Sequence, residues 1–275
     1  MNVAIIGCGY VGSAIAQHWQ QKTALIVTAT TTTPERIPAL QALAQRVLIV
    51  QGNDTEALKS ILKNQDAALL SVAAKQSSSY EETYLQTAYA LVSALKQTPS
   101  VQQLIYTSSC SVYGEQHGAL VDEETPIAPT TANGRILGET EQVLLSASSE
   151  NLRICILRLG GIYGPGRELV KIYQRLAGTT RPGSGQEPAN WIHLDDIVAA
   201  IEFARRHRFQ GIYNLVDEDN LTNAEVAARV CELHNLPLVV WDSSLSSQRP
   251  YNAKVSNQKI KDAGYQFIHP YMLFD

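Results

Sequence analysis

The sequence predicts an α/β fold with a doubly wound parallel sheet, and three observations carry this prediction. Short, continuous apolar runs recur along the chain, helix-like stretches separate them, and a glycine-rich turn follows the first run. Continuous apolar runs are typical of strands that are buried on both faces of a parallel sheet. Strands that alternate with helices in this way place helices on both sides of the sheet.

The apolar runs give the expected strands, and the stretches between them give the expected helices. Asp195 and Asp196 favour a helix start at their position, because acidic side chains stabilise the positive end of the helix dipole. Strands are expected at residues 2–7, 24–28, 47–50, 67–73, 103–107, 152–157 and 211–216. Helices are expected at residues 11–21, 80–96, 131–147, 195–206 and 223–233.

The glycine-rich turn has Gly7, Gly9 and Gly12 directly after the first strand and before the first helix. The first glycine permits a tight turn, the second lets the backbone approach a pyrophosphate, and the third lets the helix pack closely on the strand. Backbone amides around Tyr10 and Val11, at the helix start, would bind the phosphates. The turn therefore predicts a Rossmann dinucleotide site, with a purely structural turn as the alternative.

The end of the second strand bears on the choice between NAD and NADP. An NAD site usually carries a carboxylate about 20 residues beyond the turn, which binds the ribose hydroxyls. Here Thr30 and Thr31 stand in that region, and Arg36 follows shortly after. Because no carboxylate stands in this region to repel a 2′-phosphate, we expect NADP to be preferred, with NAD as the second choice. A solvated loop without selectivity is the alternative.

Composition limits the class of ligand. The net charge of -4 and the pI near 5.9 give no broad basic surface for nucleic acid or for an anionic membrane, so a small-molecule substrate is expected. The widely spaced Cys8, Cys110, Cys155 and Cys231 argue against a zinc site and against a disulfide framework, and no metal is expected. Reduced thiols and the absence of a signal-like N-terminus lead us to expect a cytoplasmic protein.

Several segments resemble the extended short-chain dehydrogenase/reductase and nucleotide-sugar epimerase superfamily. Residues 104–114, LeuIleTyrThrSerSerCysSerValTyrGly, carry the resemblance most directly. GlyAsnAsp ending at Asp54 is similar to the family's adenine-contacting turn, and Ala73 and Ala74 are similar to its nicotinamide wall. The resemblance implies that these three residues contact the cofactor. It also implies a homodimer formed through the helices expected at 80–96 and 131–147.

The family's YxxxK motif marks a departure in this chain. The motif should lie just ahead of residues 138–139, and in that register Thr131 replaces the tyrosine and Arg135 replaces the lysine. This is similar to the atypical subgroup of extended members that lacks the catalytic pair. A phenol with a pKa of about 10 can be tuned for proton transfer, whereas an aliphatic hydroxyl cannot. Arg135 could bind a ribose hydroxyl but effectively never releases its proton.

Other polar residues are candidates for the missing chemistry. The resemblance implies that Ser109 polarises a substrate carbonyl and that Ser111 lines the same small pocket, although serines at strand ends also bind their own backbone. Tyr113 is the first candidate for a replacement acid, and Tyr163 and His193 are further ones. Packing in a turn is the alternative for Tyr113, and fixation by the adjoining helix start is the alternative for His193.

These observations lead to a predicted domain division and to two hypotheses about function. Residues 1–160, with 191–217 returning to them, are expected to form the Rossmann domain. Residues 161–190 and 218–275, rich in glycine, proline and serine at first, are expected to form a small loop-rich substrate lobe. The first hypothesis is an NAD(P)-binding oxidoreductase or epimerase-like enzyme that acts on a small carbonyl or hydroxyl metabolite with an altered catalytic motif. The second is a catalytically silent NADP-binding sensor or scaffold.

Overall fold

The computed structural model describes residues 1–22, 24–74 and 79–274. The chain forms two compact units. The first unit comprises residues 1–109, 135–158 and 198–213, and the second comprises residues 110–134, 159–197 and 214–275. The predicted domain boundaries differ from these units mainly in placing 110–134 with the glycine turn, and they stay a prediction.

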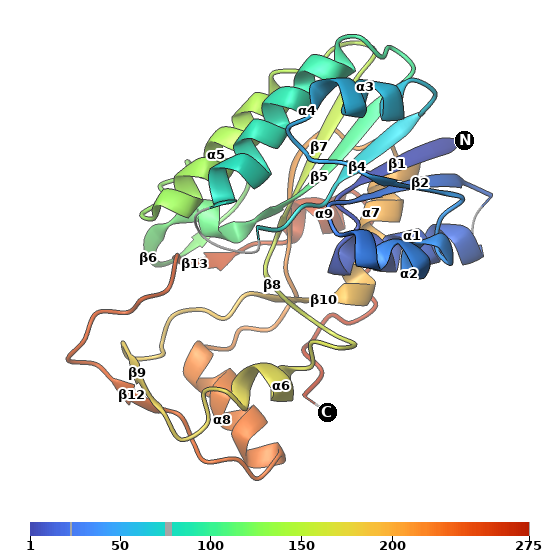
Figure 1. Cartoon of the computed structure of the whole chain (residues 1–275). Helices are drawn as coiled ribbons and strands as arrows, with labels where there is room; N and C mark the ends of the chain where they lie inside the picture. Colours follow the sequence, from blue (N-terminus) through green and yellow to red (C-terminus); the bar gives the residue numbers. More distant parts are fainter. Residues whose placement is uncertain (23, 75–78, 275) are drawn as a thin grey trace. The chain divides into compact units, whose positions relative to one another are not determined.

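A seven-stranded sheet confirms the predicted fold class (Figure 1). Its strand order is β11-β7-β5-β4-β1-β2-β3, and β1 pairs in parallel with both β2 and β4. Ligands of such sheets bind at the carboxyl ends of the strands where the order reverses, here between β1 and β4. The strands are β1 (Asn2–Ile6), β2 (Ile26–Thr31), β3 (Arg46–Ile49), β4 (Ala67–Leu70), β5 (Gln103–Ser109), β7 (Arg153–Leu159) and β11 (Gly211–Leu215).

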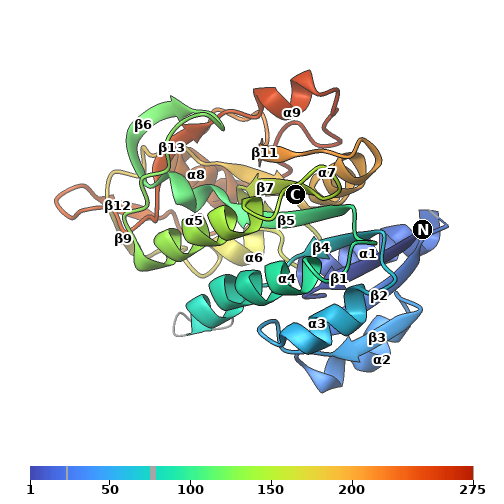
Figure 2. The same cartoon turned by 90° about the horizontal axis from the view of Figure 1, so that it is seen from above.

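Helices cover both faces of the sheet. Figure 2 shows α3, α4 and α5 on one face and α1 on the other. The predicted helix at 80–96 is not α-helical throughout, because a π-helix at Glu82–Gln86 precedes α4. The helices are α1 (Tyr10–Lys22), α2 (Ile37–Gln41), α3 (Thr55–Leu62), α4 (Thr87–Leu95), α5 (Ala132–Leu145) and α7 (Leu194–Arg206).

One hydrophobic core lies between the sheet and the helices α3, α4 and α5. Leu58 of α3, Leu91 of α4 and Leu144 of α5 are fully buried there, against strand residues such as Leu104 and Ile154. Burying apolar side chains of this size is the main favourable term in folding. The core thus fixes the strands whose carboxyl ends carry the glycine turn.

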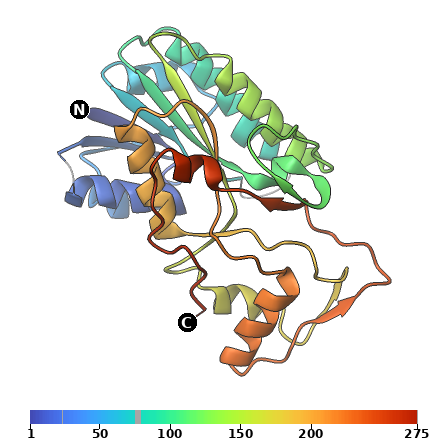
Figure 3. The same cartoon turned by 180° about the vertical axis from the view of Figure 1, so that it is seen from behind.

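The second unit is built from short elements around a core of its own (Figure 3). Its strands form parallel pairs, in which β13 pairs with β6, β10 with β8, and β12 with β9. The predicted helix at 223–233 is confirmed as α8, which begins with a capping box between Thr222 and Glu225. The strands are β6 (Glu115–Val121), β8 (Gly161–Tyr163), β9 (Thr180–Pro182), β10 (Trp191–His193), β12 (Val240–Asp242) and β13 (Asn252–Val255); the helices are α6 (Leu169–Tyr173), α8 (Asn223–Leu233) and α9 (Gln258–Asp262).

Length and hydropathy of the helices bear on membrane insertion. Within residues 1–22, 24–74 and 79–274, none of the helices combines the length and the apolar character needed to cross a bilayer.

Candidate functional site

The glycine turn joins β1 to α1 in the first unit, and its geometry requires glycine at two positions. Gly7 has a φ of 87°, in the left-handed region that favours glycine. A Cβ atom at Gly7 would lie 2.7 Å from the backbone oxygen of Ser71, and one at Gly12 would lie 2.7 Å from the backbone oxygen of Gly7. The turn is therefore tight, and the start of α1 lies directly against it.

Gly9 is different, because a Cβ atom built there would meet no described atom within 4 Å. The residue faces open space at the first turn of α1, where the leading amides of a helix have no acceptor within the helix. Such amides, together with the helix dipole, attract phosphate. The open approach to Gly9 is what the pyrophosphate of a dinucleotide needs, so the residues present fit such a cofactor.

The space beside Gly9 is a cavity of about 460 Å³ that lies within the first unit. Its walls come from the turn, the end of β2, the segment after β3, the segment after β4, and the start of the π-helix. The cavity brings together six of the predicted cofactor-binding residues. They are Gly7, Gly9, Thr30, Thr31, Arg36 and Ala73.

Thr30 and Arg36 both bond to the glycine turn. The Gly7 amide donates to the Thr30 hydroxyl over 3.1 Å, so this buried threonine holds the turn in place. The Arg36 guanidinium donates to the Cys8 carbonyl oxygen over 2.6 Å and to the Ser13 hydroxyl over 3.0 Å. Arg36 thus places a positive charge in the cavity wall at the end of β2, where a carboxylate would favour NAD.

Asp54 caps a helix, and its neighbour Asn53 lines the cavity. The Asp54 carboxylate accepts a hydrogen bond of 2.9 Å from the Ala57 amide and caps the start of α3. Asn53 lines the cavity, and its side-chain amide donates to the Glu82 carboxylate over 3.2 Å. Contact of Asp54 with the cofactor stays a prediction, and the sequence analysis did not single out Asn53 within the GlyAsnAsp turn.

The remaining predicted cofactor residues lie outside the described lining of the cavity. Tyr10 and Val11 are the first residues of α1, and Gly12 packs beneath the turn. Ala74 follows Ala73 at the edge of the described segment after β4.

At the start of α5, where the family motif was expected, the side chains differ from that motif. The Thr131 hydroxyl accepts a hydrogen bond of 3.0 Å from the Gly134 amide and caps the helix. Arg135 is exposed. The sequence of α5, AlaAsnGlyArgIleLeuGlyGluThrGluGlnValLeuLeu, contains neither tyrosine nor lysine, so no shift of register restores the catalytic pair.

Among the predicted catalytic residues, Ser109 ends β5 at the carboxyl edge of the sheet, and Ser111 lies in the short 3-10 helix that follows. Tyr113 ends that helix and is fully buried. Its hydroxyl lies 2.8 Å from both the Asp122 carbonyl oxygen and the Asn214 side-chain oxygen, within the second unit. These contacts favour a structural role for Tyr113, whose role as an acid stays a prediction.

The other two candidate acids lie in the second unit. The Tyr163 hydroxyl accepts from the Leu273 amide over 3.1 Å, and burial raises the pKa of this phenol to about 12. The ring of His193 is buried, which lowers the pKa of its imidazole. A phenol with a raised pKa is poorly suited to proton transfer near neutral pH.

A buried ion pair lies behind the edge of β5 in the first unit. Arg158 of β7 donates to Glu141 Oε2 in α5 over 2.7 Å and to Oε1 over 3.2 Å, and Ser108 donates to the same carboxylate over 2.6 Å. Both charged side chains are almost fully buried. A pair of this kind fixes α5 against the strand that ends in Ser109, because breaking it would strand a charge in the core.

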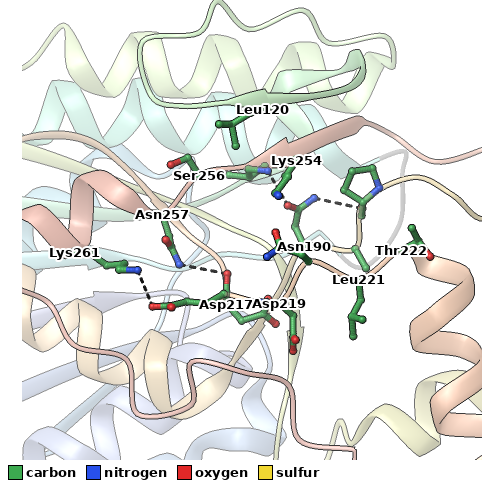
Figure 4. Close-up of a pocket in the computed structure, with 15 residues that line it drawn as sticks. Leu120, Asn190, Asp217, Asp219, Leu221, Thr222, Lys254, Ser256, Asn257 and Lys261 are labelled. Carbon is green, nitrogen blue, oxygen red and sulfur yellow. Dashed lines mark hydrogen bonds and ion pairs between the residues drawn. The ribbon is translucent and has the colours of Figure 1, made fainter.

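A second cavity, of about 300 Å³, lies within the second unit (Figure 4). Asp217 lines it, and its side chain is nearly fully buried. One of its oxygens accepts from the Asp219 amide over 3.3 Å, while the other has no hydrogen-bond partner among the described residues. Burial, and next the neighbouring carboxylate of Asp219, raise the pKa of Asp217 to about 8. This cavity holds none of the predicted site residues.

Comparison with known proteins gives a family match over most of the chain. Residues 3–215 match the model of the NAD dependent epimerase/dehydratase family. Protein YeeZ of Escherichia coli strain K12 is 34% identical over 229 residues, which cover 78% of this chain and 77% of YeeZ.

Two solved structures share the fold. The human epimerase family protein SDR39U1 (isoform 2), solved with NADPH, has a TM-score of 0.78 at 18% identity and covers 98% of this chain and 96% of its own. MoeE5 in complex with UDP-glucuronic acid and NAD has a TM-score of 0.78 at 20% identity, with 95% and 92% covered. Each of these two structures holds a nicotinamide nucleotide, and that of MoeE5 also holds UDP-glucuronic acid.

Proposed function

We propose that this chain, which belongs to the NAD dependent epimerase/dehydratase family, is an NAD(P)-dependent oxidoreductase or epimerase-like enzyme for a small carbonyl or hydroxyl metabolite. The open space in front of Gly9, at the start of a helix and beside a cavity of about 460 Å³, carries the proposal. The neighbouring structures that hold NAD or NADPH support it. We also propose that the protein is cytoplasmic and forms a homodimer.

NADP is the preferred nucleotide in this proposal. Arg36 offers a guanidinium at the end of β2, and Thr31 and its neighbours supply hydroxyls where a carboxylate would otherwise stand. A guanidinium binds phosphate through charge-assisted hydrogen bonds, which are about twice as strong as neutral ones. Arg36, which donates to Cys8 and Ser13, would hold the 2′-phosphate when NADP is bound.

The chain's own residues are assigned hydrogen bonding to the substrate and no proton transfer. The bound nucleotide supplies or accepts a hydride. Ser109 donates a hydrogen bond to the substrate oxygen and stabilises the charge that develops there, with Ser111 as a second polar group. Because α5 lacks tyrosine and lysine, and because the Tyr113 hydroxyl is bound to Asp122 and Asn214, water or the substrate itself is the favoured proton source.

Nucleotide binding is tested by calorimetric titration with NADPH and with NADH, on the natural chain and on Gly9→Val. A Cβ atom at this position meets no described atom within 4 Å, so the variant should keep its melting temperature, whereas the methyl groups of valine extend into the approach to the phosphates. We expect at least about tenfold weaker binding of both nucleotides, equivalent to about 1.4 kcal/mol. Unchanged affinity in Gly9→Val, or tighter binding of NADH than of NADPH by the natural chain, would contradict the assignment.

Activity is tested by following NADPH absorbance with panels of aldehydes, ketones and keto sugars. Ser109→Ala should lower kcat/KM by about 100-fold or more with little change in nucleotide affinity, because the lost hydrogen bond acts in the transition state. Ser108→Ala serves as the neighbouring control, since that hydroxyl bonds to Glu141 instead. Turnover that survives Ser109→Ala would remove this serine from the mechanism.

The second candidate function is a catalytically silent NADP-binding sensor or scaffold. The observation that favours it is the composition of α5, in which neither member of the expected catalytic pair occurs. Tight NADPH binding together with no turnover across broad substrate panels would support this candidate over the enzyme.

A further inference from the structure

Three side chains of metal-binding type meet in the second unit, at the start of α7. His193 ends β10, Asp195 lies in the first turn of α7, and His269 comes from the C-terminal segment beyond α9. The Asp195 carboxylate oxygen Oδ2 lies 3.5 Å from His193 Nδ1 and 3.2 Å from His269 Nε2. One ligand atom of each residue lies within 4.8 Å of the other two. Two distant stretches of chain thus bring imidazole and carboxylate donors to one point.

These separations agree with the coordination of a transition metal. Zinc binds histidine nitrogen at about 2.0–2.1 Å and carboxylate oxygen at about 2.0–2.2 Å, so the edges of its tetrahedron are about 3.3–3.5 Å long. Both separations from Asp195 lie close to that length. We propose that His193, Asp195 and His269 form a binding site for a divalent transition metal ion, with Zn²⁺ as the best match and a water molecule as the fourth ligand.

The protonation of His193 suits this role. The Asp195 amide donates a hydrogen bond of 3.2 Å to His193 Nδ1, so this nitrogen carries no proton, and a metal ion would take its lone pair in place of that hydrogen bond. Metal coordination requires that form of the ring. The side chain of His193 is 8% exposed, and its ring packs edge-on against Tyr163 and His269 at 5.1 and 4.3 Å between centroids. Packing on both sides limits the rotation of the imidazole.

The segment that carries His269 is held in place without a metal. Asp196 is fully buried, and its carboxylate accepts hydrogen bonds from the Ile268 amide over 2.7 Å, the His269 amide over 2.9 Å and the Tyr265 hydroxyl over 2.9 Å. These bonds join the C-terminal segment to the first turn of α7, within the second unit. Because the backbone is fixed in this way, two imidazoles and a carboxylate are held together before an ion arrives, which lowers the entropic cost of binding.

The test uses the full chain, stripped with a chelator and titrated with CoCl₂ and with ZnCl₂. We expect one ion per chain by calorimetry and a visible absorption band of bound Co²⁺ that Zn²⁺ abolishes. His269→Ala should weaken binding by at least about tenfold, since loss even of an outer-shell partner costs that much. Asp195→Asn should also weaken it, and this variant preserves the size of the side chain.

A matched control is provided by His117, an exposed histidine whose Nδ1 lies 3.7 Å from the Glu115 carboxylate. His117→Ala should leave the affinity unchanged. Circular dichroism of the metal-free variants separates loss of the site from loss of the fold. Less than one ion per five chains, or equal affinity in the natural chain and in a folded His269→Ala or Asp195→Asn variant, would overturn the proposal and leave the three residues as a hydrogen-bonded cluster.

Discussion

Arg36 is the residue on which the proposed preference for NADP mainly depends. The guanidinium bonds to the glycine turn and lies in the cavity wall, so we expect Arg36→Gln to weaken NADPH binding by about 10–100-fold and NADH binding by much less. The measurement is the ratio of the two dissociation constants. Arg46→Gln on β3, an exposed arginine outside the cavity lining, is the matched control. An equal loss for both nucleotides would mean that Arg36 only supports the turn.

Asp217 predicts a pH dependence of stability with a defined sign. Burial raises its pKa from near 3.8 to about 8, so the folded chain binds this proton more tightly than the unfolded chain. Its contribution to the free energy of unfolding is therefore greatest below about pH 4, falls between pH 4 and 8, and is level above pH 8.

Asp217→Asn removes this titration. Between pH 5 and pH 9, we expect the free energy of unfolding of the variant to rise by about 1–3 kcal/mol relative to that of the natural chain. This is the usual free-energy cost of leaving a buried polar group without a hydrogen bond. Urea unfolding at both pH values measures it, with the exposed Asp262→Asn as control. Parallel pH profiles of the natural chain and Asp217→Asn would place the group's pKa in its ordinary range.

At residue level, the sequence predicted well what depends on neighbours in the chain. The three glycines of the turn were recognised because each task follows from its position between a strand and a helix, and the geometry at Gly7 and Gly12 agrees. Asn53, which lines the cavity, was not singled out because it and Asp54 belong to the same short pattern, and only the structure shows that the Asp54 carboxylate accepts from the Ala57 amide. The cluster of His193, Asp195 and His269 was not predicted, because His269 lies far from the other two residues in the sequence.

At the scale of the element, α5 combines a helix cap with a lost catalytic motif. Thr131 holds the Gly134 amide, so Thr131→Ala should lower the free energy of unfolding by about 1 kcal/mol, while Thr131→Ser should lower it far less. Chemical denaturation measures both differences. If Thr131→Ala proves neutral for stability but lowers turnover, the hydroxyl acts in chemistry and not in capping.

Element boundaries were predictable where apolar runs were long. Every predicted strand has its counterpart in the sheet, because burial on both faces leaves a continuous apolar run. The π-helix ahead of α4 was not predicted, since the sequence pattern does not distinguish it from the rest of the helix expected at 80–96. The strands β8 and β9 of the second unit were not predicted either, because three-residue strands leave no periodic pattern.

At the scale of the whole molecule, the doubly wound parallel sheet and the place of the glycine turn followed from general rules of α/β folds. The domain boundaries expected from the sequence stay a prediction, and the compact units differ from them in separating residues 110–134 from residues 135–158. The homodimer expected through the helices at 80–96 and 131–147 stays a prediction.

The buried carboxylate of Asp196 has a consequence for the end of the chain. Since it anchors the backbone at Ile268 and His269, this segment can leave the first turn of α7 only if the His269 imidazole leaves with it. Occupancy by an ion and attachment of the segment are then thermodynamically linked, and each strengthens the other. Limited proteolysis would measure this linkage, with zinc slowing cleavage around His269 in the natural chain.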